Sequence, residues 1–188
     1  NGAREAYLLP VQDMVVASGL PSTNFCGTIW DNYLGLGNDN YCIWASPAGD
    51  IWTYLQFDVS DSALLAAGVP STYLNNLSGA DLILKKTQDC SAPYGSAVKL
   101  EANSTSWSEC SINWNNQPIG GGPQYNTVLS SGSTVAWPLK SPGIWDYWRS
   151  TRNYGLVIIM PTVPSGLWVV GSRSNGTSSF RPQLKLTW

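Results

Sequence analysis

The sequence contains no histidine among its 188 residues. Histidine is the commonest general base in enzymes, a usual zinc ligand and the central member of the Ser-His-Asp arrangement. Its absence removes most hydrolase and metalloenzyme mechanisms. Acid and base catalysis by two carboxylates set across a cleft would remain. Glu101 and Glu109 flank one loop, but nothing in the sequence indicates that they face each other, so we expect no enzymatic activity.

Charged residues and long apolar runs are also scarce. Charged residues make up 12% of the chain, with ten Lys and Arg against twelve Asp and Glu for a net charge of -2. Nucleic-acid binding needs clustered Lys and Arg, and the nearest approach is the pair Lys85 and Lys86. The longest apolar run, "YGLVIIM" at 154–160, is far shorter than the roughly 18 to 20 residues that span a bilayer. We therefore expect neither a nucleic-acid partner nor a membrane span.

Four cysteines are present, Cys26, Cys42, Cys90 and Cys110, and none has CxxC spacing. Because no histidine is available to share a metal, disulfide bonds are favoured, with free buried thiols as the alternative. Three pairings are open. The pairing of sequence neighbours, Cys26 with Cys42 and Cys90 with Cys110, would close two short loops. Disulfides form in oxidising compartments, which predicts an extracellular protein.

Three N-x-S/T sequons point to the same compartment. They begin at Asn76, Asn103 and Asn175, each in a polar, turn-like stretch where a glycan would be carried outside the fold. The sequence thus predicts a glycoprotein that is secreted or attached to the cell surface.

Short runs rich in β-branched and aromatic residues alternate with clusters of Gly, Pro, Asn and Ser, a pattern typical of an all-β sandwich or barrel. In "TYLQFDV", Leu55, Phe57 and Val59 fall on one face of a strand. One short helix is expected within 141–150, with Ser141 as its cap and Pro142 in its first turn. Strands are predicted at 6–9, 11–17, 52–59, 80–87, 97–101, 125–129, 134–139, 154–160, 167–172 and 182–188.

Several segments, taken in order, resemble the family 96 carbohydrate-binding modules, the DNRLRE-type domains of bacterial and archaeal surface proteins. They are "GLPSTNFCG", "YLGLG", "TYLQFDVS", "LSGADLILKK", "SWSECSINWNNQP", "NYGLVIIM" and "RPQLKLTW". The "WNNQP" element is the most specific, and the resemblance covers about residues 11–188. It implies a single β-jelly-roll sandwich and, in some members, binding to polysaccharides. Five tryptophans are interpreted as core residues because the resemblance places them within the family's structural motifs: Trp107, Trp114, Trp137, Trp145 and Trp148.

The stretch between Asp31 and Trp52 is expected to be a loop, and it departs from the family by being long and aromatic. Sugar rings stack on exposed aromatic faces, and Trp30, Tyr33, Tyr41 and Trp44 occur here with Asp and Asn residues between them. These four residues form a candidate sugar platform. The alternative is that they pack over one end of the sandwich.

A structural calcium ion is the one cofactor that the sequence leaves open, since jelly-roll modules often hold one with carboxylates and carbonyls. Asp13, Asp58 and Asp61 are the first candidates. None lies in a run with calcium-loop spacing, and a hydrogen-bonding role is favoured for Asp58 at the end of its strand.

The first seventeen residues form an apolar segment, and residues 18–188 form the expected jelly-roll domain. An extended segment can complete the sheet of another copy, and a head-to-tail contact of this kind builds a filament. The candidate donor residues are Tyr7, Leu8, Leu9, Val11, Met14 and Val16; Pro10 would interrupt the ladder midway.

The sequence therefore predicts a structural subunit of an extracellular, pilus- or thread-like filament, whose partners are other copies of itself. The alternative is a secreted, non-catalytic carbohydrate-binding module with a polysaccharide partner. A first strand that pairs within its own sheet would explain the apolar segment equally well.

Overall fold

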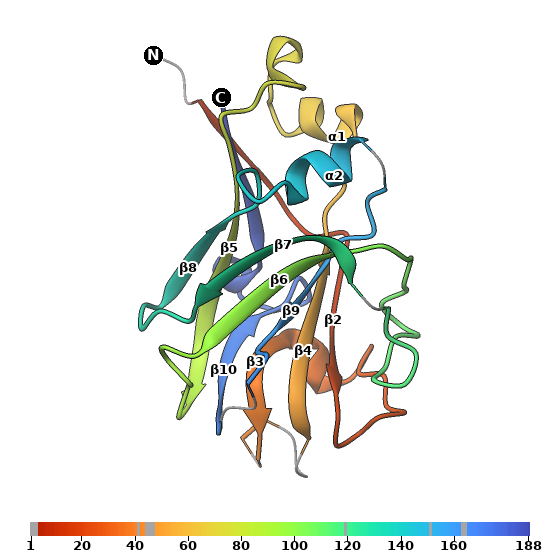
Figure 1. Ribbon diagram of the computed structural model, residues 1–188, viewed down its shortest axis with the longest axis vertical. Coiled ribbons are helices and arrows are strands. Elements are labelled where there is room, and N and C mark those ends of the chain that lie inside the picture. The colour runs from red at the N-terminus through yellow and green to blue at the C-terminus, as the bar shows by residue number, and fades with distance from the viewer. Residues whose placement is uncertain (1–3, 41, 44–47, 119, 151, 163–164) are drawn as a thin grey trace.

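The computed structural model describes residues 4–40, 42–43, 48–118, 120–150, 152–162 and 165–188 (Figure 1). Its secondary structure is mostly β, as predicted. The strands are β1 Glu5–Leu8, β2 Gln12–Ala17, β3 Tyr33–Asp39, β4 Gly49–Gln56, β5 Gly79–Cys90, β6 Ala97–Asn103, β7 Gly121–Val128, β8 Thr134–Pro138, β9 Leu156–Ile159, β10 Gly166–Gly171 and β11 Gln183–Thr187. The helices are α1 Asp61–Ala66 and α2 Ile144–Ser150, with short 3-10 turns η1 Ile29–Asn32, η2 Ser71–Tyr73 and η3 Ser178–Phe180.

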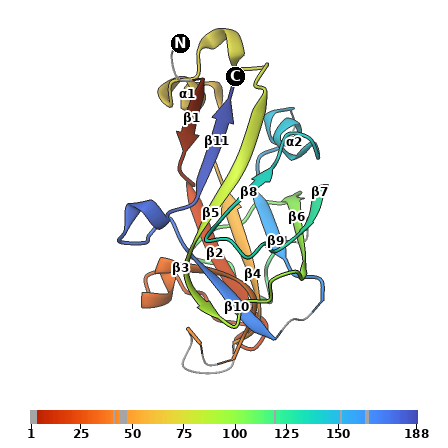
Figure 2. The ribbon, with the colours of Figure 1, turned by 90° about the vertical axis from the view of Figure 1, so that its left-hand side faces the viewer.

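The strands form one curled sheet in which the paired neighbours run antiparallel. The strand order is β1-β11-β5-β10-β3-β4-β9-β6-β7, with β2 added to β4 and β8 added to β5. The curl places β4, β9, β6 and β7 in front of β5, β10 and β3, so that the molecule has two layers (Figures 1 and 2). Apolar side chains fill the space between them, among them Leu55, Leu84, Leu100, Ile158 and Trp168, all fully buried.

Each predicted strand segment overlaps a strand of the structure, and β3 is an additional strand. The expectation that the stretch from Asp31 to Trp52 is a long loop is therefore wrong. Its glycines concealed the strand because glycine has low β propensity. They lie here because neighbouring strands come close: a Cβ atom at Gly35 would lie 3.1 Å from Cδ1 of Leu167, and Gly37 has a φ of +127° and faces the backbone of Gly166.

The expected helix at 141–150 is present as α2, which begins at Ile144 after a turn. Its buried residues are Ile144, Trp145 and Trp148. The prediction of a single helix missed α1. Ser60 caps α1 by accepting a hydrogen bond from the Ala63 N–H at 3.3 Å, but six residues are too few to show a helical period. Neither helix, within the described ranges, is long and apolar enough to cross a membrane.

The four cysteines form two disulfides, as predicted, and each bond joins segments that are distant in the sequence. Cys26 pairs with Cys110, 84 residues away, and Cys42 pairs with Cys90, 48 residues away. The structure therefore does not have the pairing of sequence neighbours. Loops of these lengths restrict the unfolded chain strongly, and the loop-entropy model assigns each bond about 4 kcal/mol of stabilisation.

The close approach of β10 to Gly37 makes a stability prediction. Replacing Gly37 by alanine should lower the free energy of unfolding by at least about 2 kcal/mol, because the new methyl group meets the carbonyl oxygen of Gly166 at a positive φ. Denaturant unfolding followed by tryptophan fluorescence measures this. The control is Gly176→Ala, which has open space around its Cβ position and should change stability by less than about 0.5 kcal/mol. Equal stability of the two variants would contradict the packing argument.

Candidate functional site

The first strand is held to the body by a single neighbouring strand. β1 pairs antiparallel with β11, with Ala6 opposite Leu186 and Leu8 opposite Leu184, and the two lie side by side in Figure 2. β1 is the end strand in the sheet order. Ala6 is buried and Leu8 is half-buried, so one face of the strand packs on the molecule.

The opposite face of this segment is apolar and exposed. Tyr7, Leu9 and Val11 are 44%, 54% and 50% exposed, respectively, whereas Leu8 and Pro10 between them are covered. Alternate residues of an extended chain point to opposite sides. The segment is therefore apolar on both faces, which is typical of strands that are buried on both faces, but in the isolated chain it buries only one.

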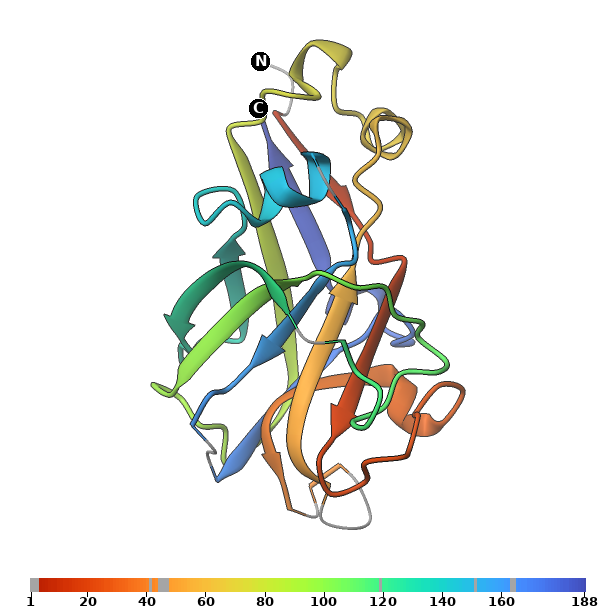
Figure 3. The same ribbon diagram turned by 45° about the vertical axis from the view of Figure 1, so that its right-hand side comes forward.

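The second half of the predicted donor segment lies in the core. β2 pairs with β4 along its length (Figure 3), and Met14 and Val16 are 2% and 0% exposed. These two side chains are therefore already packed within their own subunit. The candidate donor is restricted to β1 and the link that follows it.

A second feature is a cleft on the outer face of β4, β9 and β6. Its volume is about 390 Å³, and the loop between β6 and β7 covers one side. Trp52 of β4 and Trp114 of the loop face each other with ring centroids 4.8 Å apart and planes tilted by 52°. Tyr54, Lys99, Glu101 and Gln117 contribute further lining.

The polar groups of the cleft are held by the surrounding backbone. The Tyr54 hydroxyl lies 2.9 Å from both Gln117 Oε1 and the Pro118 carbonyl, and this contact fastens the loop to the sheet. Lys99 Nζ lies 3.0 Å from Glu101 Oε2. Burial of Glu101 favours its protonated form, but the Gly121 N–H and the Lys99 ammonium outweigh this and hold its pKa below the usual value. Glu101 therefore enters the cleft as a carboxylate.

The cleft is not predicted from the sequence. Trp114 is expected in the core, but its side chain is half-buried at the cleft wall. Trp137, Trp145 and Trp148 are buried as predicted. The available signal was the alternation in β4, which puts Trp52 and Tyr54 on the face opposite Leu55.

Only part of the predicted sugar platform can be located. Tyr41 and Trp44 lie outside the described residues. Trp30 in η1 and Tyr33 in β3 are half-buried and pack against the hydrophobic core. These two side chains therefore pack on the body of the protein, as the alternative to a sugar platform expects.

The three sequons lie in different surroundings. Asn76 is exposed. Asn103 is fully buried and donates from Nδ2 to the Tyr154 carbonyl at 3.2 Å. Asn175 is 7% exposed and donates from Nδ2 to the Asn32 carbonyl at 3.0 Å. Only Asn76 has the exposed position that the sequence predicted for all three.

The three calcium candidates do not come together. Asp58 accepts from the Ser60 N–H at 2.9 Å, which is the structural role favoured for it, and Asp61 pairs with Arg149 at 2.6 Å. Asp13 belongs to a separate network. Among the described residues, the one group of three potential metal-ligating side chains with close ligand atoms contains Cys26 and Cys110, whose sulfurs are joined in a disulfide.

The network around Asp13 connects three segments. Arg173 Nε and Nη2 donate to Glu109 Oε1 and Oε2 at 2.7 and 2.5 Å, and the Asp13 N–H donates to Glu109 Oε1 at 3.0 Å. The Arg173 N–H donates to Asp13 Oδ2 at 2.7 Å. Glu109 thus engages Arg173 while Glu101 engages Lys99, so the two carboxylates belong to different networks.

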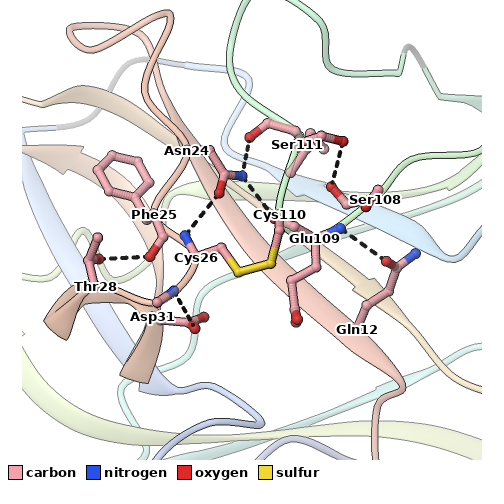
Figure 4. The surroundings of a disulfide bond; sticks show 12 residues. Gln12, Asn24, Phe25, Cys26, Thr28, Asp31, Ser108, Glu109, Cys110 and Ser111 are labelled. Carbon is pink, nitrogen blue, oxygen red and sulfur yellow. Dashed lines mark hydrogen bonds between the residues drawn. A yellow bond between two sulfur atoms is a disulfide. The ribbon is translucent and has the colours of Figure 1, made fainter.

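The Cys26–Cys110 disulfide lies directly beside this network. Figure 4 shows the Glu109 N–H donating to Gln12 and the Cys26 N–H donating to Asn24. The loop after β6 is therefore fastened both to β2 and to the segment that precedes η1.

Asp13 is fully buried, and its Oδ1 atom has no hydrogen-bond partner among the described residues. Burial raises the pKa of Asp13 from 3.8 to about 8, with Glu109 and Asp31 adding to the rise and Arg173 opposing it. The folded protein thus holds a proton that the unfolded chain releases near pH 4.

Because the folded protein holds this proton, its stability is expected to depend on pH. The pKa of Asp13 is higher in the folded protein than in the unfolded chain. The stability that this difference contributes is therefore fully present below about pH 4 and is lost as the pH rises to about 8. The free energy of unfolding should fall across this window by an amount on the order of a few kcal/mol. Asp13→Asn should remove the decline, since an amide keeps the acceptor for the Arg173 N–H, whereas the exposed Asp58→Asn control should retain it. Thermal melts from pH 4 to 9 test this, and an unchanged slope in Asp13→Asn would contradict it.

No protein-family model matches the chain, and no curated protein matches it in sequence. The resemblance to carbohydrate-binding modules stays a prediction from the motifs.

Proposed function

We propose that this chain is a structural subunit of an extracellular filament, in which β1 leaves its own body and pairs with β11 of the next copy. The observation that carries the proposal is the segment from Ala6 to Val11, which is apolar on both faces but buries only one. The two disulfides support an extracellular setting. The curled antiparallel sheet supports a jelly-roll body for the subunit.

Release of β1 has a low energetic cost. Four residues pair with one strand, and of their side chains Ala6 is buried and Leu8 half-buried. The same hydrogen bonds and contacts form again when β1 of another copy lies on β11. Exchange therefore conserves the strand energy, and the balance depends on the new contact between the two bodies.

The link between β1 and β2 supplies apolar surface for this new contact. Leu9, Pro10 and Val11 connect the strands, and three extended residues reach only about 10 Å. Two bodies that exchange β1 must therefore touch where the link crosses between them. Burial of the exposed parts of Leu9 and Val11 at this junction would stabilise it by about 1 kcal/mol for each residue.

The exchange builds a chain of subunits because donor and acceptor are different surfaces. Each copy donates its β1 to one neighbour and accepts the β1 of another neighbour along its own β11, and it can do both at once. Such a contact continues into a filament unless the rotation between copies closes a ring.

The exposed apolar face allows a test that spares the subunit itself. The triple variant Tyr7→Ser, Leu9→Ser, Val11→Ser should fold with nearly unchanged stability but fail to polymerise, because its side chains are exposed in the isolated chain. Light scattering and electron microscopy measure assembly. The control is Ile29→Ser, which removes a side chain that is 69% exposed in η1 and should assemble normally.

Two results would overturn the filament. One is assembly of the triple variant at the wild-type rate. The other is a wild-type protein that stays monomeric, or that stops at a closed dimer, at high concentration. Deletion of residues 1–9 should likewise abolish polymerisation.

A second function is favoured by the cleft. Aromatic side chains beside a few polar groups are the usual lining of a ligand pocket, and exposed aromatic faces can stack on sugar rings; Trp52, Trp114 and Gln117 have this arrangement. Surface display of such a site on each subunit is compatible with a filament. Lys99 is the cation among the described residues that line the cleft, and it is paired with Glu101, which favours uncharged sugars.

This second function has its own test. Trp114→Ala should weaken binding to neutral polysaccharides about tenfold, as expected when one stacking face is lost. Affinity electrophoresis against a panel of polysaccharides measures the change. Trp30→Ala serves as the matched control, because Trp30 lies in η1 outside the cleft, and it should bind like the wild type. Equal binding by Trp114→Ala would remove the cleft from consideration.

A further inference from the structure

One ion pair joins β1 to β11 on the outer face of the sheet. Glu5 Oε2 lies 3.0 Å from Lys185 Nζ. In the strand register Lys185 lies opposite Tyr7 on one side and opposite Asp81 of β5 on the other. The Tyr7 hydroxyl also donates to Glu5 Oε1 at 3.3 Å. The contact therefore belongs to the edge that β1 occupies.

The apolar residues of β1 do not by themselves specify one register. A shift of two residues along β11 would keep apolar side chains on the inner face, with Leu8 in the position of Ala6. Short strands that lack distinctive residues are prone to such slippage. Glu5 is the one acidic residue in the first twelve, and a two-residue shift would carry it about 7 Å along the strand, away from Lys185.

The charges are consistent with a formed contact at neutral pH. The Lys185 ammonium lowers the pKa of Glu5, and Glu5 in turn raises the pKa of Lys185. Both side chains are partly exposed, 33% for Lys185 and 42% for Glu5, so the pair contributes little to the stability of one subunit. Its effect is on selection of register and partner.

We propose that Glu5 of one subunit pairs with Lys185 of the next, and that this ion pair sets the register of the exchanged strand and selects an identical chain as the donor. The inference rests on the proposed strand exchange. The strand carries Glu5 with it when it leaves its own body, and the acceptor edge carries Lys185. Each junction of the filament then contains one such pair between two chains.

Charge reversal tests the pair. Glu5→Lys alone places two lysines at each junction, and Lys185→Glu alone places two glutamates. Glu5 and Lys185 also pair within the closed subunit, so each single variant places the same repulsion in the closed subunit and at the junction, and it should assemble at about the wild-type critical concentration. An equimolar mixture should lower the critical concentration about fivefold below that of either variant alone, because junctions between unlike copies join opposite charges whereas every closed subunit keeps like charges.

The mixture separates contacts between chains from contacts within a chain. A pair that forms only within one chain has like charges in every copy, and mixing cannot restore it. The control for the change in net charge is Arg152→Glu, which alters an exposed residue by the same amount as Lys185→Glu and should assemble like the wild type. Circular dichroism verifies that each variant folds.

The outcomes distinguish this inference from the proposed function. If mixing does not lower the critical concentration below that of either variant alone, the ion pair does not select the donor, although strand exchange stands. If the wild type does not assemble, the filament itself is wrong.

Discussion

Strand β5 is the element on which the rest of the sheet depends. Its first half pairs with β11 on one edge and β8 on the other, and its second half pairs with β10. Ala80, Leu82 and Leu84 alternate along it and point into the core. Because β11 lies against β5, its other edge needs a partner, and β1 fills that edge. The N-terminal strand thus completes a row of hydrogen bonds that begins at the centre of the molecule.

The cleft depends on a different constraint, which is the fastening of the loop after β6. A disulfide fastens this loop to the segment before η1, the Arg173–Glu109 pair fastens it to the segment after β10, and the Tyr54 hydroxyl fastens it to β4. Without these contacts Trp114 would not face Trp52, since the two residues are on segments far apart in the chain. β1 and the cleft therefore depend on separate contacts, and variants in one need not disturb the other.

The success of strand prediction here has a local cause. Apolar residues at every second position lie on one face of a strand regardless of which strand is adjacent. Segments such as Thr53–Val59 can therefore be recognised as strands from the sequence alone. β3 was not predicted because it contains Gly35 and Gly37. These glycines are needed where β10 packs closely against β3, and only the folded chain reveals that contact. For the same reason Asn103 looked like an exposed sequon residue although its amide is engaged with Tyr154.

The sequence by itself determined the β-rich class, the positions of ten strands, the presence of α2 and the use of cysteine in disulfides, because these follow from local spacing and composition. Only the tertiary structure decided which cysteines pair, that Asp13 is a buried acid beside Glu109 and Arg173, and that Trp52 and Trp114 form a cleft. It also decided that Met14 and Val16 belong to the core while Tyr7, Leu9 and Val11 keep an uncovered face. Each of these features depends on contacts between segments that are distant in the sequence. Local spacing carries no information about such contacts.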